Sequence, residues 1–295
     1  MSFSINLISD LQEMWQYAFM QHAFEAGTIV AIVAGIVGYF VVLRRSSFAA
    51  HALSHVGFAG AAGAVLFGVD PVLGLLLFTS AGGITMAVLG RRATQRDVQI
   101  GMVLAFMLGL GVLFISLYTG YATEAYSILF GEILGISVND VLVTFAASLV
   151  IVSVIVVVYR PLLFASLDED VAEAKGLPML WLGIIFMLLL AVATSIAVQV
   201  VGVLLIFSLM VTPAAIAQRL TKRSRRGIVI SVSIALAATW LGIFISYYEP
   251  YPVSFFITSM VFALYLIVVI LQRVKMNSKV TNGLIGKKEV KGTSP

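Results

Sequence analysis

Long apolar stretches, separated by short breaks that contain charges, prolines or glycines, run through almost the whole sequence. A helix needs about 20 mainly apolar residues to cross the hydrocarbon part of a bilayer. Dividing the chain at the breaks predicts nine such helices, of which the second and seventh are short and rich in small residues. The predicted spans cover 27–43, 52–67, 72–89, 100–118, 141–159, 180–198, 202–217, 227–247 and 253–271. The predicted fold is therefore an all-α polytopic membrane protein with eight or nine transmembrane helices.

Composition supports a membrane protein and excludes several other classes. Of the 295 residues, 61% are hydrophobic and only 11% are charged, and the mean hydropathy is +1.07. So few charges cannot cover a soluble globule of 31.7 kDa, which excludes soluble enzymes, secreted disulfide scaffolds and disordered chains. In a membrane chain the net charge of +4 is typical of topology rather than of nucleic-acid binding. Because there is no cysteine, any metal ligand must be a histidine, a carboxylate or a carbonyl oxygen.

The positions of the basic residues predict an orientation. Nine crossings place all 18 lysines and arginines on one side of the membrane, in Arg44 and Arg45, 91–96, 160–175, 219–226 and the tail from Arg273. The positive-inside rule makes that side cytoplasmic, so we expect a multi-pass protein of the plasma or inner membrane with an outside N-terminus and a cytoplasmic C-terminus. The opposite side carries only acids, namely Asp10, Glu13, Glu25, Asp70, Glu124, Glu132, Asp140 and Glu249. These acids either concentrate cations at the outer face or are incidental to the topology.

The chain divides into three predicted parts. Residues 1–24 contain acids and lack the basic and apolar regions of a cleavable signal peptide, so we expect an amphipathic helix lying on the membrane. Residues 25–272 form one transmembrane domain. The lysine-rich end, 273–295, is predicted to be a disordered cytoplasmic tail attracted to acidic lipid.

One cytoplasmic connection, 160–178, is longer than the others and is predicted to contain a short acidic helix. Ser166 would cap this helix, acids would occupy its first turn and favour its dipole, and Gly176 with Pro178 would end it. The helix is either a docking element for a partner or a solvated connector. Its candidate docking residues are Ser166, Asp168, Glu169, Asp170, Glu173 and Gly176. The chain has no GxxxxGK[ST] phosphate loop, so we do not expect it to hydrolyse ATP.

Six segments resemble one family of transporters. The run VVLRRSSFAAHALSHVGFAGAAGA from Val41 is similar to the first signature of the zinc/manganese/iron permeases of ATP-binding cassette importers, which is close to LRR-x-S-x-x-G-D-A-x-S-H-A-V-L-P-G. Similar segments follow in the family's order and extend the resemblance from Phe19 to Leu271. They are RRATQRDVQIGM, LFGEILGIS, SLDEDVAEAKGLP, VQVVGVLLIFSLMVTPAAIAQRLTKR and YYEPYPVSFFI.

The resemblance implies a compact permease bundle with short or broken central helices and no chemistry of its own. Such a permease works as a homodimer with two copies of a separate ATPase, and an extracytoplasmic metal-binding protein supplies the ion. The family's ATPase-contacting helix maps onto residues 166–177. No permanent cofactor is implied, only a transported divalent cation. Two other classes are alternatives: a secondary transporter or channel without an ATPase, and a membrane metalloenzyme, for which an HExxH-type motif and a clear third ligand are missing.

The strongest candidates for metal contact are His51 and His55. Four residues apart on a helix, they lie on one face about 6 Å apart along the axis, and Ala59 and Gly63 continue that face with little bulk. They either form part of the metal pathway or only hydrogen-bond carbonyls or Ser54 across a helix contact. The family usually has Asp and Pro where this chain has His51 and Ala59. Loss of the carboxylate shifts the expected preference from manganese toward zinc.

Weaker candidates carry two interpretations each. Glu132 either lines an outer gate or caps a short helix, and Gln199 either contacts a hydrated ion or hydrogen-bonds a neighbouring helix. Pro213 bends the seventh span as a gating element or as a static kink.

Two further sites are expected to be mainly structural. Asp97 either caps the fourth span or pairs with Arg96, and His22 with Glu25 form a pair at the outer edge of the first span that we expect to be solvated.

Overall fold

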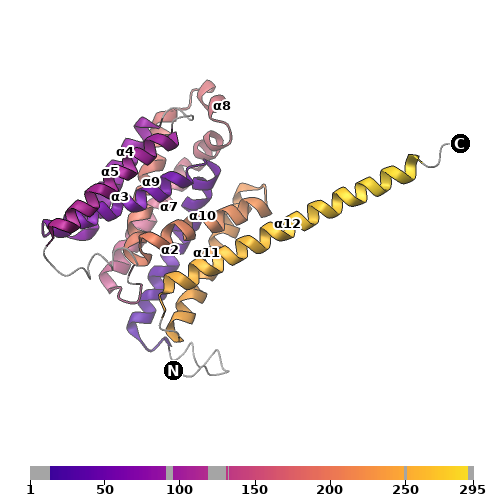
Figure 1. The fold of residues 1–295 in the computed structure, drawn as a ribbon. Helices are drawn as coiled ribbons and strands as arrows, with labels where there is room; N and C mark the ends of the chain where they lie inside the picture. Colours follow the sequence, from indigo (N-terminus) through magenta and orange to yellow (C-terminus); the bar gives the residue numbers. More distant parts are fainter. Residues whose placement is uncertain (1–13, 91–95, 119–130, 132, 249–250, 292–295) are drawn as a thin grey trace.

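The protein, seen in a computed structural model that describes residues 14–90, 96–118, 131, 133–248 and 251–291, is helical throughout these ranges. Eight of the described helices are long and apolar enough to cross a membrane, and α10 is a shorter apolar helix, which confirms the predicted fold class. The helices are α2 (Ala18–Leu43), α3 (Ser47–Leu66), α4 (Pro71–Leu89), α5 (Arg96–Leu117), α7 (Val138–Leu167), α8 (Glu169–Ala174), α9 (Met179–Val201), α10 (Val203–Leu220), α11 (Ser224–Tyr248) and α12 (Val253–Lys291) (Figure 1).

Several helices are longer than the sequence predicted. Helix α2 begins at Ala18, so residues 18–24 belong to the first span and not to a separate surface helix; residues 1–13 lie outside the described residues. Helix α7 continues through Pro161 to Leu167, across residues expected to form a loop. Helix α12 extends to Lys291 and projects from the bundle (Figure 1), where a disordered tail was expected. The reason is that a charge marks where the bilayer ends, whereas a helix can continue into water.

Burial in the bundle does not follow hydrophobicity. Helices α2, α3 and α9 are buried along most of their length, whereas α5, α7 and α12 are mostly exposed, although α3 is the least apolar of the eight long helices. Lipid tails are as apolar as leucine side chains, so helices in a membrane associate through close packing of small residues. Gly60 of α3 and Gly74 of α4 show this, because a Cβ atom on either glycine would collide with the carbonyl oxygen of the other.

Hydrogen bonds between helices show which helix ends lie together. Arg44, after α2, donates to the Ser166 hydroxyl at the end of α7, and Arg219, at the end of α10, donates to Gln272 of α12. We call the end of the bundle that holds these residues and α8 the basic end. At the opposite, acidic end, Gln199 of α9 donates to Asp140 at the start of α7. These contacts, with the bond from Gln218 of α10 to the Tyr39 carbonyl oxygen, place the C-terminal ends of α2, α7 and α10 together and the start of α7 beside the C-terminal end of α9.

Two acids of the acidic end have local structural roles. The Asp70 carboxylate caps α4 by accepting from the Val72 N–H at 2.7 Å. Asp140 forms a capping box with Ser137 at the start of α7. These contacts support the interpretation that both acids serve helix termini, which lack intrahelical partners for their first N–H groups.

Candidate functional site

The two histidines form a pair on the buried helix α3. The centroids of the His51 and His55 rings are 4.7 Å apart and the rings are nearly perpendicular, at 84°. Both residues are half-buried, and within the described residues neither imidazole makes a hydrogen bond. The Ser54 hydroxyl donates instead to the His51 carbonyl oxygen at 2.7 Å. The structure thus brings the predicted pair together, and within the described residues the imidazole nitrogens do not bond to a backbone carbonyl or to Ser54.

A third ring completes the surroundings of this pair. The Phe207 ring of α10 lies 5.2 Å from the His51 ring, measured between centroids. Helix α10 begins at Val203, and Gly202 is the single residue that separates it from α9. The Gly202 backbone has φ 83° and ψ 163°, a conformation that is essentially restricted to glycine. Val201 and Val203 on both sides of Gly202 are buried. No local sequence pattern indicates Phe207, because only the fold brings α10 to α3.

The arrangement offers two nitrogen ligands from one helix. No group of three or more His, Cys, Asp or Glu side chains converges among the described residues. Zinc binds imidazole nitrogen at about 2.0–2.1 Å, so two imidazoles on one tetrahedral ion have nitrogens about 3.3 Å apart. Rings with centroids 4.7 Å apart can reach this separation by rotation about their side-chain bonds. Two protein ligands leave the remaining positions to water, which suits an ion that is passed on.

The weaker candidates lie apart from the histidine pair or outside the described residues. Gln199 donates from Nε2 to Asp140 at 2.9 Å, which is the helix-to-helix bond that the sequence allowed. Pro213 is buried within α10, which stays helical around it. Asp97 lies exposed in the first turn of α5, and the Arg96 side chain is outside the described residues, as is Glu132. His22 is half-buried and Glu25 exposed on α2, near the acidic end.

Helix α8 lies where the short acidic helix was predicted, with one correction. Its cap is Asp168, which accepts from the Val171 N–H at 3.0 Å, and not Ser166. Ser166 belongs to the last turn of α7, where its hydroxyl donates to the Leu162 carbonyl oxygen. The prediction failed because α7 continues past the expected membrane edge. Gly176, with φ 79°, follows the end of α8, as predicted.

A buried arginine connects α8 to the start of α3. The Arg44 side chain is only 2% exposed, and its guanidinium lies 3.8 Å from the Glu169 carboxylate. It also stands over the Phe186 ring of α9, 5.1 Å from the centroid. Arg44 therefore joins the turn before α3, the short helix α8 and the core helix α9, which sequence reasoning did not foresee.

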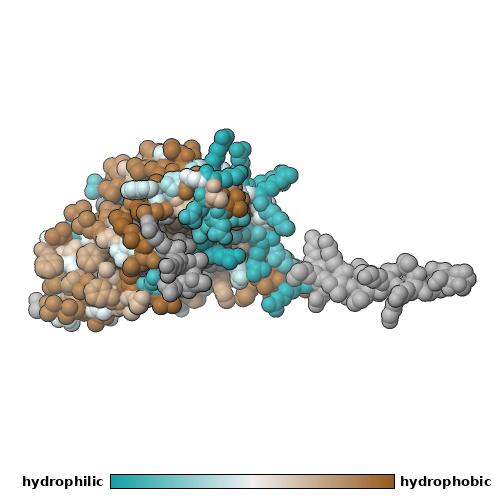
Figure 2. Space-filling view, turned by 90° about the horizontal axis from the view of Figure 1, so that it is seen from above, coloured by the Kyte–Doolittle hydropathy of each residue, from teal (hydrophilic) through white to brown (hydrophobic). Residues whose placement is uncertain are grey.

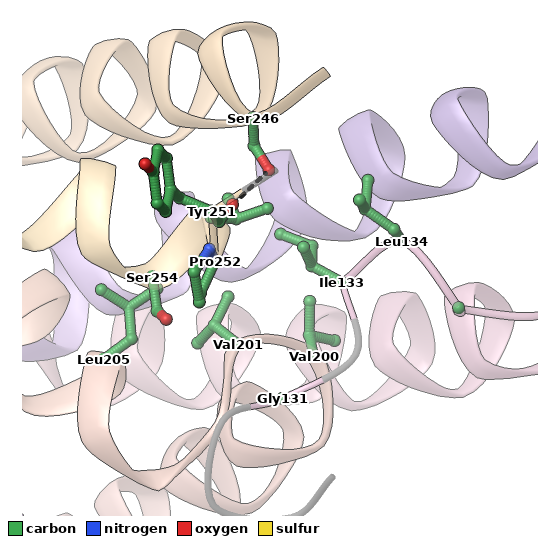
Figure 3. Close-up of a pocket in the computed structure, with 12 residues that line it drawn as sticks. Gly131, Ile133, Leu134, Val200, Val201, Leu205, Ser246, Tyr251, Pro252 and Ser254 are labelled. Atoms are coloured by element: carbon green, nitrogen blue, oxygen red, sulfur yellow. Dashed lines mark hydrogen bonds between the residues drawn. The ribbon is translucent and has the colours of Figure 1, made fainter. Parts of the chain in front are cut away.

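A cavity of about 610 Å³ opens at the acidic end (Figure 3). It is lined by Gly131 and residues 133–135, by Val200 and Val201, by Leu205, and by Ser246 with Tyr251–Ser254. The Ser246 hydroxyl donates to the Tyr251 carbonyl oxygen in its wall, as the dashed line in Figure 3 shows. No described lining residue is acidic or histidine. Leu205 lines this cavity while Phe207 contacts His51, so the first turns of α10 lie between the cavity and the histidine pair.

Fold and site together define a polytopic helical membrane permease. The chain belongs to the ABC 3 transport family, whose model matches residues 16–272. It is 31% identical over 238 residues to the manganese transport system membrane protein MntC of Listeria monocytogenes, covering 80% of this chain and 85% of that protein. It is 30% identical over 238 residues to the manganese import system permease protein ScaB of Streptococcus gordonii, with the same coverage.

A solved structure has the same fold. The structure of PsaBC from Streptococcus pneumoniae in complex with Fab matches with a TM-score of 0.79 at 29% identity, covering 89% of this chain and 95% of that chain. The chain is therefore a transport permease and not an enzyme, as the resemblance implied.

Proposed function

We propose that this chain is the permease subunit of an ATP-driven importer of divalent metal ions, with manganese, zinc or iron as substrate. A separate ATPase would drive it, an extracytoplasmic metal-binding protein would deliver the ion, and two copies of the permease would form a homodimer. The basic end would face the cytoplasm, with the N-terminus outside. Family membership and the names of the relatives support this proposal.

The paired imidazoles inside the bundle are the observation that carries the proposal. Ionisable side chains within membrane spans are costly, and they commonly mark the path of an ion or a proton through the bundle. His51 and His55 face each other on the most buried helix, without hydrogen bonds within the described residues. A passing divalent ion would bind both nitrogens, and it could leave again because the protein does not supply a complete coordination shell.

Two observations bear on the identity of the metal, and they favour different ions. Both relatives named above are manganese transport proteins, which favours manganese. Two imidazoles, with no carboxylate beside them among the described residues, favour zinc, because manganese prefers oxygen ligands. We propose that His51 widens the substrate range toward zinc, and both ions belong in the same assay.

Helix α8 is the proposed docking element for the ATPase. Ala172 is buried in a small cluster with Ala165 and Leu182, so the helix is held against the bundle. Its acids and the apolar Val171 are exposed. A protein partner that meets this surface could move α8, and through Arg44 the start of α3, between outward-open and inward-open states.

Uptake into vesicles tests the site. The permease is reconstituted with its candidate ATPase and supplied with the binding protein, and ATP-dependent uptake of zinc and of manganese is measured. We expect His51→Ala with His55→Ala to abolish uptake of both ions while ATP hydrolysis and folding persist. His22→Ala, the remaining histidine of the chain, is the matched control and should transport normally. Normal uptake by the double variant would show that the pair only packs helices.

The same vesicles separate an ATP-driven importer from a secondary transporter. We expect no uptake without ATP or without the ATPase chain. Uptake along an ion gradient by the permease alone would instead support a secondary transporter or channel.

Single cysteines test the orientation without background labelling, since the chain has none. Lys222→Cys should react with an impermeant reagent only from the cytoplasm and Asp70→Cys only from outside. The reverse pattern would overturn the proposed topology.

A further inference from the structure

A second cavity, of about 620 Å³, lies at the basic end between the end of α7 and the start of α11. Most of its lining is arginine. The lining residues are Tyr159, Arg160, Leu163, Arg223, Ser224, Arg225 and Arg226. Figure 2, which looks onto the side of the bundle that holds α8 in Figure 1, shows hydrophilic residues gathered in a patch near the point where α12 projects from the bundle.

These positive charges have no acidic counterpart within the described residues. No carboxylate lines the cavity, and the one described ion pair joins Arg44 to Glu169 elsewhere. Helix α11 begins at Ser224, in the cavity wall, so its dipole adds positive potential there. Arginine forks bind phosphate oxygens two at a time, and N–H groups at a helix start favour the same ligand. The chemistry of the cavity fits a phosphate group.

The surroundings indicate the source of that phosphate. One turn deeper than Arg160 on α7, Val156 and Val157 are 69% and 80% exposed. One turn deeper than Arg225 on α11, Val229 is 64% exposed. On both α7 and α11, the residues therefore change from arginine to exposed apolar side chains within a single helical turn. A phospholipid fits this pattern, because its phosphate and its acyl chains are joined in the same order.

We propose that this cavity binds the phosphate group of an anionic membrane phospholipid, with its acyl chains lying against the apolar faces of α7 and α11. Arg160 holds the phosphate from α7, Arg223 holds it from the residue before α11, and Arg225 and Arg226 hold it from the first turn of α11. Basic cavities between transmembrane helices at the membrane surface recognise such headgroups in general.

Native mass spectrometry of the purified full chain tests the site. The protein is titrated with phosphatidylglycerol and with phosphatidylcholine of the same acyl chains. We expect phosphatidylglycerol to bind more tightly, and Arg160→Gln with Arg226→Gln to weaken its binding on the order of tenfold or more, since each basic group near a membrane surface contributes about fivefold. The control, Lys175→Gln with Lys222→Gln, removes two exposed charges of the same end that do not line the cavity, and it should weaken binding much less than the arginine variant.

Three outcomes would overturn the proposal. An equal loss of phosphatidylglycerol binding in the lysine control would show that the lipid is held by general charge attraction. Unchanged binding in the arginine variant would show that the cavity does not hold lipid, and this conclusion would stand whether or not that variant still binds the ATPase. Displacement of phosphatidylglycerol by millimolar inorganic phosphate would identify a free phosphate as the ligand. If the double variant unfolds, the single variant Arg160→Gln, at an exposed position, answers the same question with a loss of about fivefold.

Discussion

Gly60→Ala tests whether close packing of α3 and α4 holds the helix that carries the histidines. A Cβ atom at position 60 would collide with the Gly74 carbonyl oxygen and would lie 2.6 Å from the Phe78 Cβ atom. Neither contact can be relieved by rotating a side chain, because one atom is backbone and the other is attached to it. The two helices must therefore move apart, and His55, five residues earlier on α3, moves with them.

The expected size of the effect follows from two opposing terms. Inserting a methyl group into a filled contact costs about 1–3 kcal/mol, and a backbone contact belongs at the upper limit. Replacing a helical glycine by alanine stabilises the helix by up to about 1 kcal/mol, because the unfolded chain loses backbone freedom. We expect Gly60→Ala to lower the free energy of unfolding by about 2 kcal/mol.

A matched variant separates the two terms. Gly109 of α5 is exposed, and a Cβ atom there would meet nothing within 4 Å, so Gly109→Ala should be neutral or stabilising by up to about 1 kcal/mol. Unfolding of both purified variants by SDS titration gives the comparison, and metal uptake in vesicles shows whether the histidines still work. A Gly60→Ala variant as stable as Gly109→Ala would refute the close-packing argument.

Three smaller perturbations follow from other contacts and use the same unfolding titration. Thr79→Val removes the buried hydroxyl contact of 2.7 Å to Ser195 and should cost only about 0.6 kcal/mol, less than Gly60→Ala; a larger loss would mean that the pair does more than bond two helices. Glu169→Gln should lower the free energy of unfolding by less than about 1 kcal/mol, because its carboxylate is 49% exposed. Arg44→Gln should lower it by about 2 kcal/mol and reduce ATP-driven uptake, since this variant also loses the contact with the Phe186 ring. Equal losses in the two variants would contradict this ranking. Gln199→Leu breaks the bond to Asp140 and should leave more than half of the uptake, and abolished uptake in a folded variant would restore Gln199 to the ion pathway.

The sequence predicted that His51 and His55 lie together, but it did not predict which residues surround them. A spacing of four residues on a helix brings His51 and His55 together wherever that helix lies, and the structure confirms the contact. Phe207 and Arg44 were missed as parts of the site, because their contacts come from helices that are distant in sequence. Ser166 was given the wrong role since nothing in the local pattern shows that α7 continues beyond the membrane edge.

The order of apolar and charged residues alone set the class of protein, the number of helices to within one and the separation of basic from acidic helix ends, because the bilayer imposes a length and a charge distribution on each span. It left open which helices are buried. Every span is apolar enough for lipid, so hydrophobicity cannot rank them by burial, and the least apolar long helix, α3, is the most buried. Contacts of small residues such as Gly60 with Gly74 make that choice, and these exist only when both helices are in place.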